Sequence, residues 1–351
     1  MNLTKNKGVK KMKKFIAIIM ASLMLLSLFI FAGCQTQENG ENETNNNGNN
    51  TAETLKLGLG LSIVGASSDA TADAAGEDQL TVTAAVVLVD ADGKIVKAFI
   101  DCADSTVTHT ADGKAVSVES FKTKYELGDS YNMVAYGQAK QEWYKQADAF
   151  CALLVGKTAT EVKAMVAETG KGNDDVIGAG CTIYVSDFVK AVEKAMANAV
   201  ESAATANDTL KLGVSTSQTA TDVTAEAAGS NKIESYFFAA AVDANGKVVA
   251  ATSDCVEATF EFDATGKTAF DATKEILSKK EKGADYGMVA YGGAAKEWFE
   301  QAAAFDAACI GKTASEIGSL MGADYKGNAD LQAAGCTIYV SGFVKAATKI
   351  G

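Results

Sequence analysis

The chain has 351 residues with 48% hydrophobic and 22% charged side chains, a formal net charge of −12, and neither proline nor arginine. The first ~50 residues do not have the pattern of a folded domain. The remaining ~300 residues suit two domains of ordinary size with packed cores. The acidic charge opposes binding to nucleic acid or anionic lipid, and no basic patch is interleaved with aromatic residues. Without arginine, a phosphate group has to be held by lysine, hydroxyl or backbone N–H groups.

The first residues have the layout of a secretory signal peptide. A basic stretch from Lys5 to Lys14 precedes an apolar run of 17 residues, Phe15 to Phe31. The following Ala32-Gly33-Cys34 resembles a lipobox, in which cleavage leaves the cysteine as a diacylated N-terminus. We therefore expect residues 1–33 to be removed and Cys34 to anchor the protein at the outer face of the cell membrane. The alternative, an uncleaved transmembrane helix, is disfavoured because the run barely spans a hydrocarbon core of ~30 Å.

Cleavage changes the charge and exposes a polar segment. Residues 1–33 hold six lysines and no acid, so their loss from a total of −12 leaves −18. Residues 34–53 are rich in Asn, Glu, Thr and Gly, with almost nothing apolar. Such a segment cannot bury enough surface to fold, so we expect a disordered tether behind the lipid anchor.

The remainder of the chain is a duplication. Thr54–Gly58 recurs as Thr209–Gly213, and Gly180–Val185 as Gly335–Val340, both 155 residues later. The turn Asp92-Gly93-Lys94 recurs at an offset of 153 instead. A repeat of this length is a whole domain rather than a solenoid unit. We expect one copy over residues 54–204 and the second over residues 209–351.

Each copy predicts strands followed by helices. Alternating apolar residues predict a half-buried strand over Leu80–Val89, then a turn and a partner strand over Ile95–Ile100. Helical spacing from Ala139 to Leu154 predicts a long helix, and a short one follows over Thr158–Glu168. Ser186 is a suitable cap for a last helix that carries Phe188 to Met196. This order predicts an α+β fold with a small antiparallel sheet and packed helices in each copy.

Each copy resembles the FMN-binding domain family. This family is found in the C subunit of the sodium-pumping NADH:quinone oxidoreductase, the G subunit of the Rnf complex and Gram-positive flavin lipoproteins. Four segments carry the resemblance in the family's order: an opening hairpin, a flavin-contacting leucine-glycine segment, a helix ending in a Gly-Lys turn, and a terminal motif with its helix. They lie at Leu80–Val96, Glu126–Asp129, Trp143–Lys157 and Ala179–Met196. The resemblance implies that Leu127 and Gly128 face a flavin ring. In the second copy, Glu281–Ala284 replaces that leucine-glycine segment.

The family's terminal motif, Ser-Gly-Ala-Thr-x-Thr, fits the chain in two registers. One covers Ile177–Thr182 and makes Thr182 the final threonine. The other covers Ala179–Tyr184 and keeps the next helix in phase, and we prefer it. The family's final threonine accepts FMN through a phosphoester bond, but in this register its place is taken by Tyr184, and by Tyr339 in the second copy. Covalent flavin is therefore not expected. The resemblance implies a non-covalent FMN site at Gly180, Cys181, Thr182 and Tyr184, and at Gly335, Cys336, Thr337 and Tyr339.

Two hypotheses for function follow. Thr182 and Ser186 precede a predicted helix, whose free N–H groups and dipole suit a phosphate, although these residues can equally end a strand and cap a helix. In the first hypothesis, a surface lipoprotein binds flavin without a covalent bond and passes electrons to a redox partner, the isoalloxazine supplying the chemistry. In the second, it is a binding or structural lipoprotein that has lost flavin.

Other candidate sites have weaker support. His109 is the only histidine, so a catalytic histidine would leave one copy of a duplicated hydrolase inactive. No Cys-x-x-Cys, His pair or haem-attachment motif predicts a metal. Cys102 and Cys181, with their counterparts Cys255 and Cys336, could form one disulfide per copy in an extracellular protein. Small buried thiols are the alternative, which we favour.

Overall fold

The computed structural model describes residues 53–351, which belong to one compact unit. The expected signal peptide, Cys34 and nearly all of the tether lie outside the described residues. The strands and longer helices of the first copy are β1 (Thr54–Ser67), β2 (Gly76–Val89), β3 (Ile95–His109), β4 (Ala115–Val116), α2 (Trp143–Leu154), α5 (Ser186–Ala197) and β5 (Val200–Thr205). Its short helices are α1 (Lys124–Leu127), η1 (Gly128–Tyr131), α3 (Ala159–Lys163) and α4 (Asp174–Gly178).

The second copy follows a turn at residues 206–208 and repeats this order, but among the described residues it has no strands that correspond to β4 and β5. Its strands are β6 (Thr209–Thr221), β7 (Gly229–Val242) and β8 (Val248–Phe262), and its longest helix is α7 (Trp298–Cys309). The shorter helices are α6 (Lys279–Lys282), η2 (Gly283–Tyr286), α8 (Ala314–Ile317), η3 (Gly318–Leu320), α9 (Ala329–Ala333), α10 (Ser341–Ala347) and η4 (Thr348–Ile350). None of the helices within residues 53–351 is both long and apolar enough to cross a bilayer.

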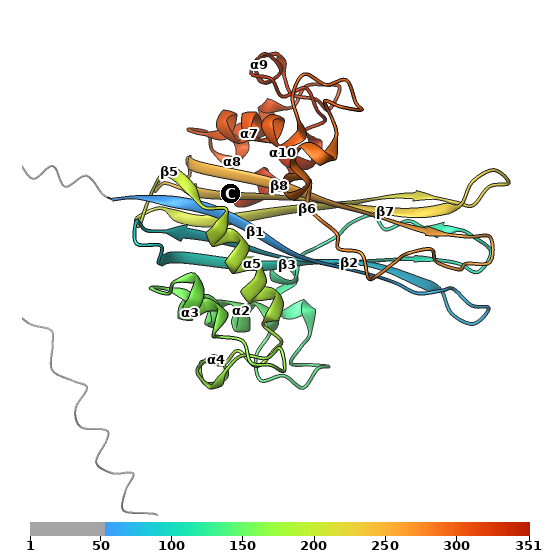
Figure 1. Cartoon of the computed structure of the whole chain (residues 1–351), viewed down its shortest axis with the longest axis horizontal. Coiled ribbons are helices and arrows are strands. Elements are labelled where there is room, and N and C mark those ends of the chain that lie inside the picture. The colour runs from blue at the N-terminus through green and yellow to red at the C-terminus, as the bar shows by residue number, and fades with distance from the viewer. Residues whose placement is uncertain (1–52) are drawn as a thin grey trace, which may run out of the picture. The chain divides into compact units, whose positions relative to one another are not determined.

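The strands form two antiparallel sheets, which confirms the mixed α+β class. The first has the order β4-β3-β2-β1-β5 and the second the order β6-β7-β8. The two sheets pack face to face, and each carries the helices of its own copy on the outside (Figure 1). Leu80, Val82 and Val86 of the first sheet share one apolar core with Phe237 and Phe260 of the second. A second core lies between the first sheet and its helices, and a third lies between the second sheet and its helices.

The central strands are buried on both faces, so the prediction of a half-buried strand was wrong for the end of β2. Residues Ala84 to Leu88 are all fully buried. Ala84, Val86 and Leu88 point into the core between the sheets. Ala85 and Val87 point the other way, into the core that the first sheet shares with α2 and α5. The unbroken apolar run over residues 84–89 is typical of a strand covered on both sides. The predicted partner strand was also too short, because β3 continues to His109.

Glycines in β1 and β6 let the last helix of each copy approach the sheet closely. A Cβ on Gly60 would lie 2.2 Å from the carbonyl oxygen of Ala191, and one on Gly213 would lie 1.9 Å from that of Ala346. Ala346 is the counterpart of Ala191, so Gly213 is the structural counterpart of Gly60. The ladder agrees, since Gly60 pairs with Ala85 and Gly213 with Phe238. Structurally equivalent residues of the two copies are therefore already 153 positions apart in the first strand. The matching sequence Thr54–Gly58 and Thr209–Gly213, which is 155 positions apart, does not mark equivalent positions.

The six described cysteines are free, and five of them are buried. The conceivable Cys102–Cys181 and Cys255–Cys336 disulfides are absent from residues 53–351, which supports the interpretation as buried thiols. Burial raises the pKa of Cys102 to about 12 and that of Cys181 to about 11. These thiols therefore stay protonated and pack as small apolar groups.

Candidate ligand-binding site in the second copy

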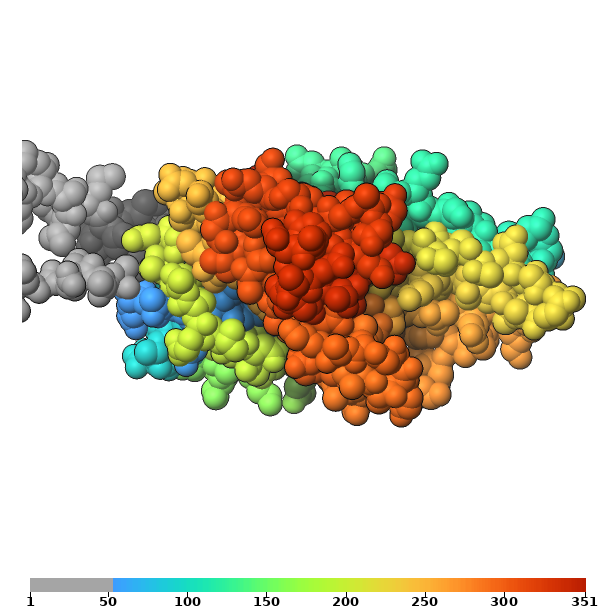
Figure 2. Space-filling view, turned by 90° about the horizontal axis from the view of Figure 1, so that it is seen from above, coloured from blue at the N-terminus to red at the C-terminus, as the bar shows by residue number. Residues whose placement is uncertain are grey.

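A pocket of about 580 Å³ lies on the outer face of the second sheet. It is bounded by β6 and β7, by α6 and η2, by the start of α7, and by the segment that leads into α10. Figure 2 shows the helices of the second copy covering one part of the sheet, while the turn between β6 and β7 extends beyond them. The pocket thus lies beside α10, over the part of β6 and β7 that includes Ser217 and Glu234.

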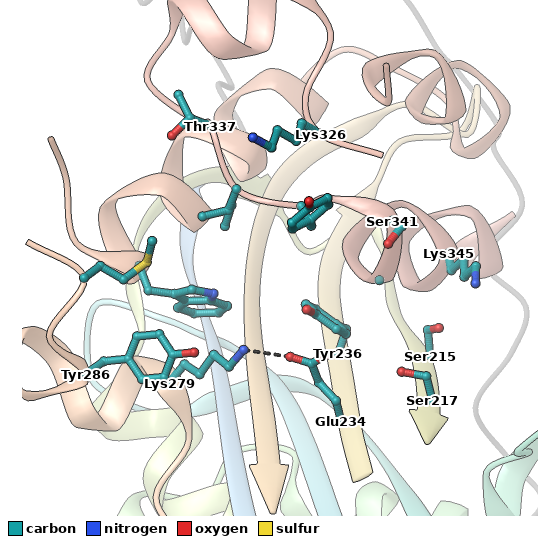
Figure 3. Close-up of a pocket in the computed structure, with 15 residues that line it drawn as sticks. Ser215, Ser217, Glu234, Tyr236, Lys279, Tyr286, Lys326, Thr337, Ser341 and Lys345 are labelled. Carbon is teal, nitrogen blue, oxygen red and sulfur yellow. Dashed lines mark hydrogen bonds and ion pairs between the residues drawn. The ribbon is translucent and has the colours of Figure 1, made fainter. Parts of the chain in front are cut away.

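The pocket has an aromatic side and a hydroxyl side. Tyr286 lies at one end, with Trp298 and Met288 also in the lining. Ser215 and Ser217 on β6, together with Ser341 and Lys345 on α10, gather at the other end (Figure 3). The ring of Tyr236 stands between them. Such a division suits a ligand that is planar and apolar at one end and anionic at the other.

A buried lysine forms the floor of the aromatic side. The Lys279 ammonium lies 2.7 Å from Glu234 Oε1 (Figure 3). It also lies 3.1 Å from Glu257 Oε2. The same ammonium lies 5.3 Å from the ring centre of Tyr286 and 5.8 Å from that of Trp298. Burial alone would lower the pKa of Lys279, but the negative groups around it outweigh burial and raise the pKa. Lys279 is therefore a fixed cation whose charge is already compensated.

The first copy has the same lysine. Lys124 pairs with Asp104 at 3.0 Å and lies 5.2 Å from the ring centre of Tyr131 and 6.0 Å from that of Trp143. Sequence reasoning missed both lysines. The signal was present, because lysine, tyrosine and tryptophan recur together at an offset of 155.

The structure places part of the predicted site at this pocket. Thr337 and Tyr339 line it, and Cys336 is fully buried just before them. Gly335 has a positive φ of 99°, a backbone conformation that favours glycine. Tyr339 is 63% exposed at the rim, with the Lys326 ammonium 5.6 Å from its ring centre.

The first copy holds the equivalent residues in the same arrangement. Tyr184 is 67% exposed, and Lys171 lies 5.6 Å from its ring centre. Cys181 is buried, and Gly180 has φ of 102°.

The threonines are less free than the sequence suggested. The backbone N–H and the hydroxyl of Thr337 both donate to Gln301 Oε1, at 2.8 and 3.0 Å. Thr182 does the same with Gln146 at the same two distances. A buried glutamine in each copy thus takes both donors of the threonine, so only its acceptor oxygens remain for a ligand. Ser186 is the first residue of α5, whose N-cap is Val185, so the predicted serine cap was wrong.

Leu127 and Gly128 lie elsewhere. They form the C-terminal end of α1, whose first residue is Lys124, and Gly128 ends that helix with φ of 53°. Their counterparts Lys282 and Gly283 stand outside the lining of the 580 Å³ pocket. In the second copy, Lys279 at the start of α6 lines the pocket, whereas Lys282 and Gly283 at the end of α6 do not.

His109 has a structural environment. It is fully buried, and its Nε2 lies 3.1 Å from the carbonyl oxygen of Gly266. Because a carbonyl only accepts, Nε2 carries a proton that it donates to the second copy. Nδ1 lies 3.1 Å from Asp78 Oδ2. Both ring nitrogens are thus engaged, and neither faces a nucleophile. Among residues 53–351, no cluster of three His, Cys, Asp or Glu side chains could hold a metal ion.

Comparisons of the chain with models of protein families, with curated proteins and with solved structures found no match. What the site can do is therefore argued from its own residues.

Proposed function

We propose that the protein is a membrane-anchored lipoprotein with two FMN-binding-like domains, which binds FMN without a covalent bond in the pocket of its second copy and carries electrons at the cell surface. The observation behind this proposal is the pocket beside Thr337 and Tyr339. Its volume of about 580 Å³ is within the ~300–1,000 Å³ usual for small-molecule and cofactor sites.

The lining suits FMN in two respects. Tyr286, Trp298 and Met288 offer aromatic and thioether surface to a ring. Ser215, Ser341 and Lys345 offer hydroxyl and ammonium groups to a phosphate, which is what a chain without arginine must use. When bound, the isoalloxazine would supply the redox chemistry, and a redox partner would exchange electrons with it. Tyr339, in place of the family's threonine, gives no reason to expect a phosphoester.

Removal of the pocket lysines tests the proposal. Titration of the purified chain with FMN, followed by flavin fluorescence, is expected to show saturable binding. Lys326→Ala and Lys345→Ala are each expected to raise the Kd roughly 5–30-fold, because a lost charged hydrogen bond costs about 1–2 kcal/mol. Lys274→Ala is the control, since Lys274 is exposed in the same copy and lies outside the pocket lining. Absence of binding at high micromolar FMN would overturn the proposal.

The second candidate function is a binding or structural lipoprotein that has lost flavin. Gln301 favours it, because it takes both donors of Thr337. Under this alternative, a folded chain with an intact pocket shows no affinity for FMN.

The anchor is tested separately. Cys34→Ser is expected to shift the protein from the membrane fraction to the medium, because two acyl chains provide stable anchoring and a tether alone provides none. The mass of the membrane-bound form should show loss of residues 1–33 and addition of lipid. A Cys34→Ser protein that stays on the membrane would contradict this.

A further inference from the structure

The two copies differ at the hydroxyl end of the site. Ser215 of the second copy corresponds to Ser62 of the first, since Gly213 corresponds to Gly60. Gly342 and Asp187 are counterparts at the second residue of α10 and α5. In the first copy, the Ser62 hydroxyl donates to Asp187 Oδ1 at 2.8 Å. The Lys190 ammonium lies 3.9 Å from the same oxygen.

Asp187 thus supplies an anion from within the chain. Its carboxylate binds Ser62 and lies near Lys190, the counterparts of Ser215 and Lys345. Those are the groups that would meet a ligand's phosphate in the second copy. A phosphate placed in the first copy would face this carboxylate, and like charges at short range repel. In the second copy, Gly342 has no side chain, and Ser215 is left to face the pocket.

A change on the facing strand matches this difference. Tyr236 on β7 corresponds to Thr83 on β2. A Cβ on Gly342 would lie only 2.3 Å from the ring of Tyr236, so a large residue on the strand requires glycine on the helix. The first copy has the reverse combination, the small Thr83 with Asp187. At this place, the second copy therefore has the aromatic ring of Tyr236, and the first copy has the carboxylate of Asp187.

We infer that the two copies are not equivalent: the site for an anionic aromatic ligand, a phosphate monoester of a planar ring, is confined to the second copy, and Asp187 occupies the anion position of the first. This inference rests on the proposed function for the nature of the ligand. It adds a stoichiometry of one ligand per chain and a residue that determines it.

Stoichiometry and paired lysine variants test the confinement. Calorimetric titration of the full chain with FMN is expected to give one site. Lys326→Ala/Lys345→Ala should weaken that binding at least tenfold, and Lys171→Ala/Lys190→Ala, the matched change in the first copy, should leave it unchanged. Two sites, or a loss of binding with the first-copy pair, would overturn the confinement while leaving the proposed function intact. No binding at all would instead defeat the proposed function.

A graft of the first-copy pair tests the role of the charge. Tyr236→Thr/Gly342→Asp is compared with Tyr236→Thr/Gly342→Asn, which has the same shape without the charge. The Asp variant is expected to bind FMN at least tenfold more weakly than the Asn variant, whereas both should bind riboflavin, which lacks the phosphate, with equal affinity. Equal weakening of FMN binding in the two variants would overturn the assignment of Asp187 as the built-in anion.

Discussion

At the scale of single residues, each copy buries one carboxylate beneath its first short helix. Asp101 is 4% exposed and accepts hydrogen bonds from the backbone N–H groups of Cys102 and Tyr125, at 2.6 and 3.0 Å. Its counterpart Asp254 is 7% exposed and accepts from the Ser278 hydroxyl at 2.6 Å. Burial raises the pKa of each from 3.8 to about 6, against the opposing effect of these donors.

This pair predicts a pH dependence of stability. Because the folded state takes up protons near pH 6 and the unfolded state only near pH 4, stability from these groups is lost as the pH rises through that window. Each group accounts for at most about 3 kcal/mol of this change, because one pKa unit corresponds to about 1.4 kcal/mol. Thermal unfolding should therefore show a smaller fall in Tm between pH 4.5 and 7 for Asp101→Asn/Asp254→Asn than for the parent chain. Equal pH profiles for the two proteins would contradict this.

The candidate site shows what single residues reveal in a sequence. A duplicated motif and a resemblance both pointed to Thr337 and Tyr339, and both residues line the pocket. Lys279 was missed because one lysine among several in a polar segment gives no sign that Glu234 and Glu257, from two different strands, will surround it. Tyr236 was missed for the same reason, since its exposure to a pocket depends on Gly342, about 100 residues away.

At the scale of elements, glycines decide how closely a helix approaches a strand. β1 carries Gly58, Gly60 and Gly65, and glycine normally weakens a strand. The sequence analysis predicted no strand there, although Leu55, Leu57, Leu59 and Leu61 alternate with the period of a strand. In the structure, Gly58 and Gly60 are where the backbone of α5 reaches the sheet. Close approach of another backbone is the usual purpose of a glycine within a strand.

Filling these positions should destabilise the fold. Gly60→Ala and Gly213→Ala each place a methyl group about 2 Å from a helix carbonyl oxygen, and overpacking of this kind costs about 1–3 kcal/mol. Each should lower the midpoint of chemical denaturation. Gly178→Ala is the control, because nothing lies within 4 Å of a Cβ at that position. If Gly60→Ala were as stable as Gly178→Ala, the close helix contact would be disproved.

At the scale of the whole described unit, equivalent contacts cross between the copies in both directions. Lys349 pairs with Glu126, and the counterpart pair Lys194–Glu281 runs the other way. The ring of His109 stacks on its own counterpart, Phe262, with centres 4.3 Å apart. The duplication was readable in the sequence. That the two sheets would share a core was not, because an apolar strand face does not show whether a helix or a second sheet will cover it.

A shared core predicts one unfolding transition for residues 53–351. Leu80 is fully buried between the sheets, so Leu80→Ala should cost about 2–5 kcal/mol. Scanning calorimetry should show a single transition that moves to lower temperature as a whole. If the substitution split the transition and left a second-copy peak at its original temperature, the copies would be independent folding units.

The two-way contacts between the copies have a consequence for how the halves can change. In an assembly of identical subunits, every substitution occurs on both sides of the axis, so a residue that benefits one side is imposed on the other. Here the two halves are separate stretches of one polypeptide. One half can therefore carry Asp187 while the other carries Gly342 at the equivalent position.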